Sequence, residues 1–171
     1  MSKIDINPAS FSPFINSINS LEDVIRLIDE LNTTSRFLFR GKEGTIYQKA
    51  SDFLPINLAS IFLDLEAKGL EPRGDTHQMS FLQTLIGKIR DLPQVKVTLA
   101  FEPNKSLIAK INNLISDQVG SKVILDLTVD QYIIGGASFE YKGKYFYYNL
   151  AEKLNTSLEE IISKADFQLN Q

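Results

Sequence analysis

The fold is decided by residues 95–129, which read VKVTLAFEPNKSLIAKINNLISDQVGSKVILDLTV. Apolar and polar side chains alternate from Val95 to Phe101, the pattern of a half-buried strand. The Pro-Asn pair at 103–104 then opens an amphipathic helix that Gly120 ends, and a second alternating strand follows over residues 123–129. A strand–helix–strand unit favours a parallel pair of strands joined by a crossover.

A hairpin and a last helix follow this unit. Residues 132–141 and 144–148 carry strand patterns on either side of Lys142-Gly143, which predicts a hairpin turned at that pair. Thr156 and Glu159 then have the spacing of a capping box and predict the start of a helix. The apolar residues of that helix are Leu158, Ile161, Ile162 and Ala165.

The residues before Pro93 carry helical patterns instead. Ser20 and Asp23 have capping-box spacing, so we expect a helix to begin at Leu21. Further helical stripes cover residues 46–54, which Pro55 must end or kink, and then 58–65 and 79–89. The stripe of the first helix consists of Leu21, Val24, Ile25, Ile28 and Leu31.

Three smaller segments complete the first half of the chain. Residues 1–19 contain two prolines and many Ser and Asn residues, so they are predicted to form an arm or loop. The stretch FLFRGKEG at 37–44 leaves a short strand and a turn open. Gly69 is expected to end a helix in the left-handed conformation, and Asp75 or Thr76 to cap the next one.

Together these patterns predict an α+β fold of two domains. Residues 1–93 would form an N-terminal helical bundle. Residues 94–171 would form a small α/β domain with a mixed sheet that contains a hairpin.

Composition excludes several classes of function. The 171 residues include 18 basic and 21 acidic side chains, and this formal charge of −3 does not indicate a nucleic-acid or anionic-membrane partner. No cysteine is present, which excludes disulfides, thiolate nucleophiles and Cys-based zinc sites. The single histidine, His77, excludes a zinc site built on several imidazoles. With no signal-peptide pattern and no long apolar run, we expect a soluble intracellular protein.

The Gly135-Gly136 pair is the most unusual local feature of the sequence. A phosphate cradle would need a helix N-terminus and usually a Lys, Ser or Thr partner, and neither follows the pair directly. Within a strand pattern, glycines more often mark a bulge or a close backbone approach, and we favour that interpretation.

Other polar residues give weaker indications of a site. Asp126 and Asp130 would share a strand face about 13 Å apart, too far for paired carboxylate chemistry, so a solvated face is favoured. The basic residues Arg36, Arg40 and Lys42 are expected in an exposed loop, and His77 on the surface. The hairpin tyrosines would suit base stacking, but no basic stripe accompanies them. These tyrosines are Tyr141, Tyr145, Tyr147 and Tyr148.

The second half of the chain, residues 95–154, resembles the C-terminal part of the delta subunit of F-type ATP synthases, the oligomycin-sensitivity-conferring protein family. The resemblance lies in Val129-Asp130, then Ile133-Ile134-Gly135-Gly136, then Gly143, in the family's order and spacing. Two features depart from the family pattern. Tyr147-Tyr148-Asn149 stands where the family usually has Asp-Gly-Ser, and the family's six-helix N-terminal bundle is longer than the 94 residues preceding Val95 here.

The resemblance implies a non-catalytic subunit without a cofactor or catalytic or metal site. Such a connector ties the catalytic head, through its alpha subunits, to the b subunits of the peripheral stalk, at the cytoplasmic face of the inner or plasma membrane. We expect the partner-binding surfaces on Leu21, Val24, Ile25 and Ile28 and on Leu158, Ile161 and Ile162. The alternative for each of these residues is an ordinary place in the core.

Rival functions remain open at this stage. A small α/β enzyme or nucleotide-binding domain would place a pocket at Gly135-Gly136. A stalk subunit of a V-type rotary ATPase would carry a long N-terminal helix, against which Pro8, Pro13 and Pro55 argue. An RNA-binding module would use the hairpin tyrosines.

Overall fold

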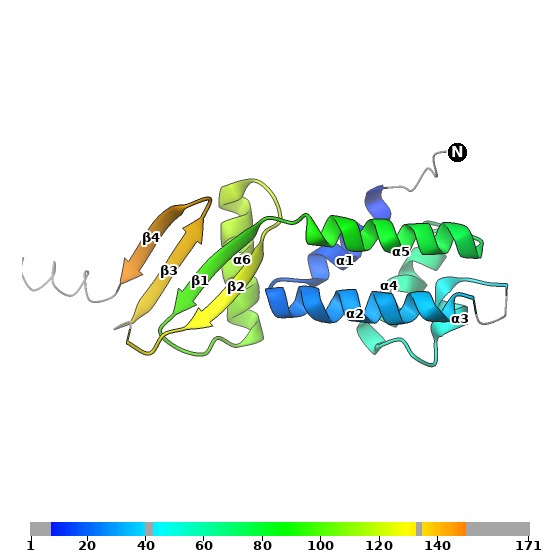
Figure 1. Cartoon of the computed structure of the whole chain (residues 1–171), viewed down its shortest axis with the longest axis horizontal. Helices are drawn as coiled ribbons and strands as arrows, with labels where there is room; N and C mark the ends of the chain where they lie inside the picture. The colour runs from blue at the N-terminus through cyan, green and yellow to red at the C-terminus, as the bar shows by residue number, and fades with distance from the viewer. Residues whose placement is uncertain (1–7, 40–42, 133–134, 150–171) are drawn as a thin grey trace, which may run out of the picture. The chain divides into compact units, whose positions relative to one another are not determined.

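The computed structural model describes residues 8–39, 43–132 and 135–149. The chain divides into two compact units (Figure 1). The first consists of Met1–Pro93 together with Asn112–Ile124, and the second of Gln94–Ile111 together with Leu125–Gln171. Helices come first and a four-stranded sheet second, so the predicted α+β fold class is confirmed. The assignment of two domains that meet after residue 93 stays a prediction.

The first unit is built from short and long helices around one apolar core. Figure 1 shows α5 lying alongside α2, and the two helices are in contact. The rings of Phe11 and Phe81 are stacked, with their centroids 5.1 Å apart. The rings of Phe14 and Phe62 meet edge to face, with their centroids 5.3 Å apart. The elements before Pro93 are η1 Pro8–Ser10, α1 Ser12–Ser17, α2 Leu21–Phe37, α3 Ile46–Ala50, α4 Ile56–Ala67 and α5 Asp75–Arg90.

The prediction of an arm or loop over residues 1–19 is wrong for the described part, residues 8–19. Phe11, Phe14 and Ile18 are buried in the core; Phe14 lies in helix α1, and Phe11 and Ile18 flank its two ends. Their spacing places them on one side of a helical turn. Pro13 does not interrupt α1, because it lies at the start of the helix, where a missing backbone N–H costs nothing.

Helix α2 begins as its sequence predicts. The Ser20 hydroxyl oxygen accepts from the backbone N–H of Asp23 at 3.3 Å, and the Asp23 carboxylate accepts from that of Ser20 at 3.2 Å. The helix then continues through Phe37, so the strand alternative for the start of FLFRGKEG is wrong. Helical winding persists there because Thr34 and Leu38, four residues apart, are both buried on the core side.

The later helix boundaries correct three expectations. Helix α3 begins with a second capping box, Thr45 with Gln48, and ends at Ala50 rather than continuing to Pro55. Pro55 instead precedes the first residue of α4. Gly74, not Asp75 or Thr76, occupies the N-cap of α5. Gly69 adopts φ 64° after α4, as expected of a left-handed cap.

The sheet has the strand order β2-β1-β3-β4. The backbone N–H of Ile124 donates to the carbonyl of Pro93, and that of Asp130 donates to the carbonyl of Leu99. The two partners advance along both strands in the same direction, so β1 and β2 run parallel, as predicted. Helix α6 joins them, and β3 pairs antiparallel with both β1 and β4. The bounds are β1 Gln94–Leu99, α6 Lys105–Val119, β2 Ile124–Val129, β3 Gly136–Tyr141 and β4 Lys144–Asn149.

The hairpin turns where its sequence predicts. Lys142 and Gly143 have φ of 50° and 73°, and two successive positive φ angles characterise the type I′ turn of a two-residue hairpin. The first strand of the hairpin begins at Gly136, not at Tyr132. Gly135 and Gly136 themselves have φ of 62° and 137°, conformations that favour glycine.

Burial along the parallel strands follows the predicted alternation only in β1. Val95, Val97 and Leu99 are buried, whereas Phe101 lies beyond the strand and is exposed. In β2, Ile124 and Leu125 are both buried, so the expected alternation fails at its start. The reason is that Ile124 packs into the core of the helical unit.

A buried polar network holds residues 112–124 in the first unit. The amide nitrogen of Asn112 donates to the carbonyls of Val123 at 2.8 Å and Asn19 at 2.9 Å. Its oxygen accepts from Lys122 Nζ at 2.7 Å, and Lys122 also donates to the side-chain oxygen of Asn19 at 3.0 Å. Burial lowers the pKa of Lys122, an effect that the charge of Asp23 opposes. The network fixes this segment against the residues that begin α2.

Candidate partner-binding site

The predicted contact residues on α2 divide between the core and the surface. Val24 is buried, and Leu21 and Ile28 are half-buried against the same core. Ile25 lies on a different side of the helix and leaves 56% of its surface exposed. Of these four residues, Ile25 is therefore the best placed to contact a partner.

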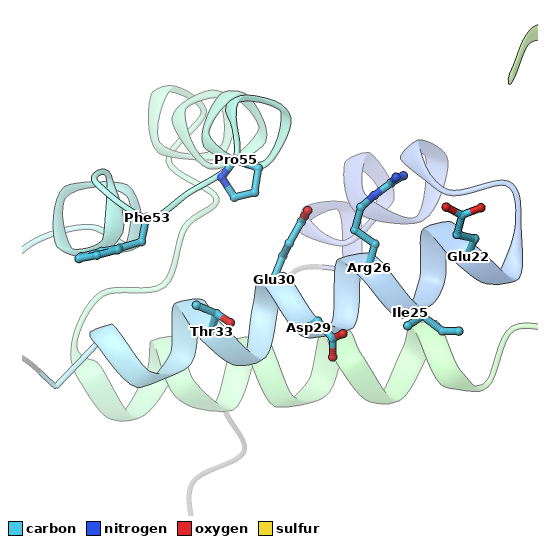
Figure 2. Close-up of a pocket in the computed structure, with 8 residues that line it drawn as sticks. All are labelled: Glu22, Ile25, Arg26, Asp29, Glu30, Thr33, Phe53 and Pro55. Atoms are coloured by element: carbon cyan, nitrogen blue, oxygen red, sulfur yellow. The ribbon is translucent and has the colours of Figure 1, made fainter.

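Ile25 lines a shallow cavity of about 450 Å³, which we call the α2 groove. Figure 2 shows Arg26 and Glu30 projecting from α2 on the side of the segment that carries Phe53 and Pro55. The α2 groove is lined by Glu22, Ile25, Arg26, Asp29, Glu30, Thr33, Phe53 and Pro55.

The segment between α3 and α4 supplies the aromatic part of the groove. The ring of Phe53 lies parallel to that of Phe37 at 4.0 Å, and this stacking holds it in place. Even so, 58% of Phe53 is exposed, and the following Ile56 is 88% exposed. Exposed apolar side chains that neighbour one another are typical of interaction surfaces.

A second cavity, of about 90 Å³, continues the α2 groove. The two share Arg26, Glu30 and Pro55, and the second extends along the first turns of α4. Its lining includes Asn57, Leu58 and Ile61. The depression thus follows the line along which α2 faces the start of α4.

Acidic side chains predominate around the α2 groove. The lining contains three carboxylates, of Glu22, Asp29 and Glu30, and one guanidinium, that of Arg26. An Arg26 nitrogen lies 2.5 Å from the carboxylate of Asp23. Burial raises the pKa of Glu30, and the nearby charge of Arg26 partly opposes that rise. The groove therefore combines apolar surface with a negative potential.

A polar cluster around Gln78 is the other notable arrangement in this unit. The buried Gln78 amide donates to the carbonyls of Gly44 at 2.9 Å and Pro72 at 3.2 Å. Lys49, with only 2% of its side chain exposed, donates to Gln78 at 2.7 Å and pairs with Asp75 at 2.5 Å. These bonds join α3 and α5, so the cluster has a structural explanation.

Glu71 is the most perturbed acid of this cluster. One carboxylate oxygen accepts from the backbone N–H of Ile46, and the other is buried without a hydrogen-bond partner. Burial raises the pKa of Glu71 to about 7, with a bond to Ile46 opposing the rise and the charge of Glu66 adding to it. A protonated oxygen relieves the cost of a buried charge.

The residues of the predicted Val-Asp and Gly-Gly motifs take part in backbone hydrogen bonds at the strand ends of the second unit. Asp130 follows β2, its N–H donates to Leu99, and its carboxylate accepts from the N–H of Tyr132 at 2.9 Å. The carbonyl of Gly136 accepts from Ala100 N at 3.3 Å. Val129, Gly135 and Gly143 belong to the same strand ends and turn.

The remaining candidates do not gather into a site within the described residues. His77 is exposed, as expected. Arg36 is also exposed, but the expected loop is wrong there, because Arg36 lies in the last turn of helix α2. Arg40 and Lys42 lie outside the described residues. Among the described residues, no group of three His, Cys, Asp or Glu side chains is arranged to hold a metal ion. The predicted contacts Leu158, Ile161 and Ile162 also lie outside the described part of the chain.

Comparison with known families addresses the second half of the chain. Residues 78–161 match the family model of the ATP synthase delta (OSCP) subunit. The predicted resemblance of the C-terminal part is thereby confirmed, and the match also includes most of α5. No curated protein sequence matches the chain.

The delta (OSCP) match implies a subunit of the ATP synthase peripheral stalk. It suggests a structural component of a membrane-peripheral complex. In the described part of the chain, no helix is long and apolar enough to span a membrane.

Proposed function

We propose that the chain is a non-catalytic connector in the peripheral stalk of a proton-translocating F-type ATP synthase. The observation that carries this proposal is the match of residues 78–161 to the delta (OSCP) family. In this role the chain ties the alpha subunits of the catalytic head to the b subunits of the stalk, at the cytoplasmic face of the membrane. It requires no cofactor, because it works by binding.

The α2 groove is the surface proposed to contact the head. A connector needs apolar surface that remains uncovered when the subunit is alone, and in the α2 groove Ile25 and Phe53 supply it. Recognition of a helix in a groove uses such residues as anchors. The buried Val24 would act indirectly, by holding α2 in position.

The stalk is proposed to bind the C-terminal part of the chain. There, Leu158, Ile161 and Ile162 form the apolar stripe of the predicted last helix. Val129, Asp130, Gly135, Gly136 and Gly143 would shape the strand ends and the turn that precede this helix.

The proposed function can be tested by measuring how ATP hydrolysis is coupled to proton uptake. Membranes from a strain that lacks the chain should retain ATP hydrolysis by the head but lose ATP-driven proton uptake, and adding back the purified chain should restore uptake. The purified chain alone should hydrolyse no ATP. Undiminished proton uptake without the chain, or ATP hydrolysis by the chain itself, would refute the proposal.

A further inference from the structure

We propose that Glu66 and Glu71 form a pH-sensitive latch on the start of α3, which stays closed while Glu71 is protonated and opens locally once both carboxyl groups are ionised. We call this arrangement the α3 latch. It involves residues of this chain alone, so it does not depend on the proposed stalk function. It also precedes residue 78, where the match to the delta (OSCP) family begins.

Two carboxyl groups from outside α3 hold the start of this helix. The Thr45 hydroxyl donates to Glu66 at 3.3 Å, and the backbone N–H of Ile46 donates to Glu71. Glu66 lies near the end of α4, and Glu71 lies between α4 and α5. Because the two acids bind consecutive residues, ionisation of both places two negative charges at the point where α3 is attached.

The second carboxyl oxygen of Glu71 makes its charge costly. This oxygen is buried and has no hydrogen-bond partner among the described residues. Lys49 is the cation whose charge acts on Glu71, but its amine is already bound to Asp75 at 2.5 Å and to Gln78 at 2.7 Å. A buried carboxylate without its own cation is unfavourable, whereas the protonated acid is not, so the closed latch favours a protonated Glu71.

The other charged groups around the latch do not offset this cost. A cavity of about 670 Å³ shares Thr45 and Glu66 with the latch. Its lining contains more acids than bases, so ionised Glu71 would add to a negative surrounding. His77, on α5, is exposed. The charged residues of the lining are Glu43, Lys49, Glu66, Arg73 and Asp75.

The pH range of the latch follows from the acid itself. Burial raises the pKa of Glu71 to about 7, the bond from Ile46 opposes the rise, and the charge of Glu66 adds to it. A group whose pKa is raised in the closed state stabilises that state below the raised pKa and loses this effect as pH increases. With an ordinary pKa of 4.5 in the open state, the equilibrium constant for opening should increase about tenfold from pH 6 to pH 8.

Two backbone amides report whether the latch is open. The N–H of Gln48 donates to the hydroxyl of Thr45, and the N–H of Lys49 donates to its carbonyl, both at 3.1 Å. Release of Thr45 therefore exposes both amides to solvent. The ring of Phe53, beyond the end of α3, is held by its stack on Phe37, so the movement should end before that residue.

Amide hydrogen exchange of the full chain, followed by NMR, tests the latch. Protection factors already correct for the faster exchange of any unfolded chain at high pH. From pH 6 to pH 8 the protection of Gln48 and Lys49 should fall about tenfold in the unmodified chain. In E71Q, which keeps an acceptor for Ile46 but cannot ionise, it should change less than twofold. The matched control E22Q removes an exposed carboxylate of α2 and should keep the tenfold fall.

The same fall in E71Q as in the unmodified chain would overturn the proposal. So would its loss in H77Q, because histidine is the residue type that most often gives a protein a pH response near neutrality. H77Q should instead keep the tenfold fall.

Urea distinguishes a local opening from a change in the stability of the whole unit. A local opening exposes little surface, so 1 M urea should leave the protection of Gln48 and Lys49 unchanged. It should lower the protection of Leu31, in the core of α2, at least threefold. If all three amides respond equally to urea, α3 does not open by itself and the proposal fails.

Discussion

Replacing Asn112 with alanine should destabilise the first unit far more than the loss of an exposed asparagine from α6 would. The side chain is fully buried, and its amide nitrogen donates to the carbonyls of Asn19 and Val123. Its oxygen also accepts from Lys122 at 2.7 Å. The variant N112A removes these three bonds and a fourth, which the Ser116 hydroxyl donates to the same oxygen at 3.3 Å, and leaves their partners in a largely buried place.

The size of the effect follows from the unsatisfied groups. A buried acceptor left without a donor costs about 1–3 kcal/mol, and two carbonyls are affected. Lys122 retains one bond, to the side chain of Asn19, so its loss is smaller. The better helix propensity of alanine returns roughly 0.5 kcal/mol, which leaves a net loss of about 3 kcal/mol in the free energy of unfolding.

The neighbouring Asn113 provides the matched control. It is exposed on the same helix, so N113A changes the helix propensity equally without breaking the network. Because N113A keeps the gain in helix propensity without the loss of hydrogen bonds, urea unfolding followed by circular dichroism should separate the two variants by about 3.5 kcal/mol. If N112A and N113A unfold within 0.5 kcal/mol of each other, the network does not stabilise the unit as its geometry implies.

Three further outcomes are expected. Because the folded pKa of Glu71 is raised to about 7 from 4.5, the folded chain binds the extra proton, so stability should fall as pH rises from 4.5 to 7. Because Glu71 is partly exposed, the expected loss of stability over this pH range is about 1–2 kcal/mol. The variant E71Q should not show this loss when urea unfolding is measured at pH 4.5 and pH 7. The same pH dependence in E71Q and the unmodified chain would contradict the raised pKa of Glu71. K49M should cost about 2–3 kcal/mol by thermal unfolding, whereas K68M, which breaks only an exposed pair with Asp64, should cost less than 1; equal losses would contradict the difference in burial. G143A should cost about 1 kcal/mol in the same assay because residue 143 has φ 73°, with G87A in helix α5 as the control that costs nothing.

The features that depend on neighbouring residues could be predicted from the sequence. The capping box of Ser20 and Asp23 spans four residues, and the turn at Lys142-Gly143 only two, so the local pattern contains what each needs. The parallel strands followed from their alternation and from the length of the helix between them. The same holds for the family resemblance, which rests on ordered motifs within the second half of the chain.

The features that the sequence does not predict involve distant residues or small differences in orientation. Asn112 meets Asn19 across 93 positions, and Lys49 meets Asp75 across 26, and no local pattern indicates either contact. Val24 and Ile25 belong to one apolar stripe in the sequence, yet only Val24 faces the core. The sequence does not predict the α2 groove, because the groove depends on the position of Phe53 and Pro55 relative to α2. The exposed apolar residues Phe53 and Ile56, next to Pro55, were the available signal.

The proposed function places the chain in a rotary ATP synthase as a stalk connector. Affinity purification of the tagged chain from detergent-solubilised native membranes, followed by mass spectrometry, tests this claim most directly. We expect head alpha subunits and stalk b subunits to co-purify with the chain in fixed proportion. Recovery of the chain as a free monomer, without either subunit, would contradict it.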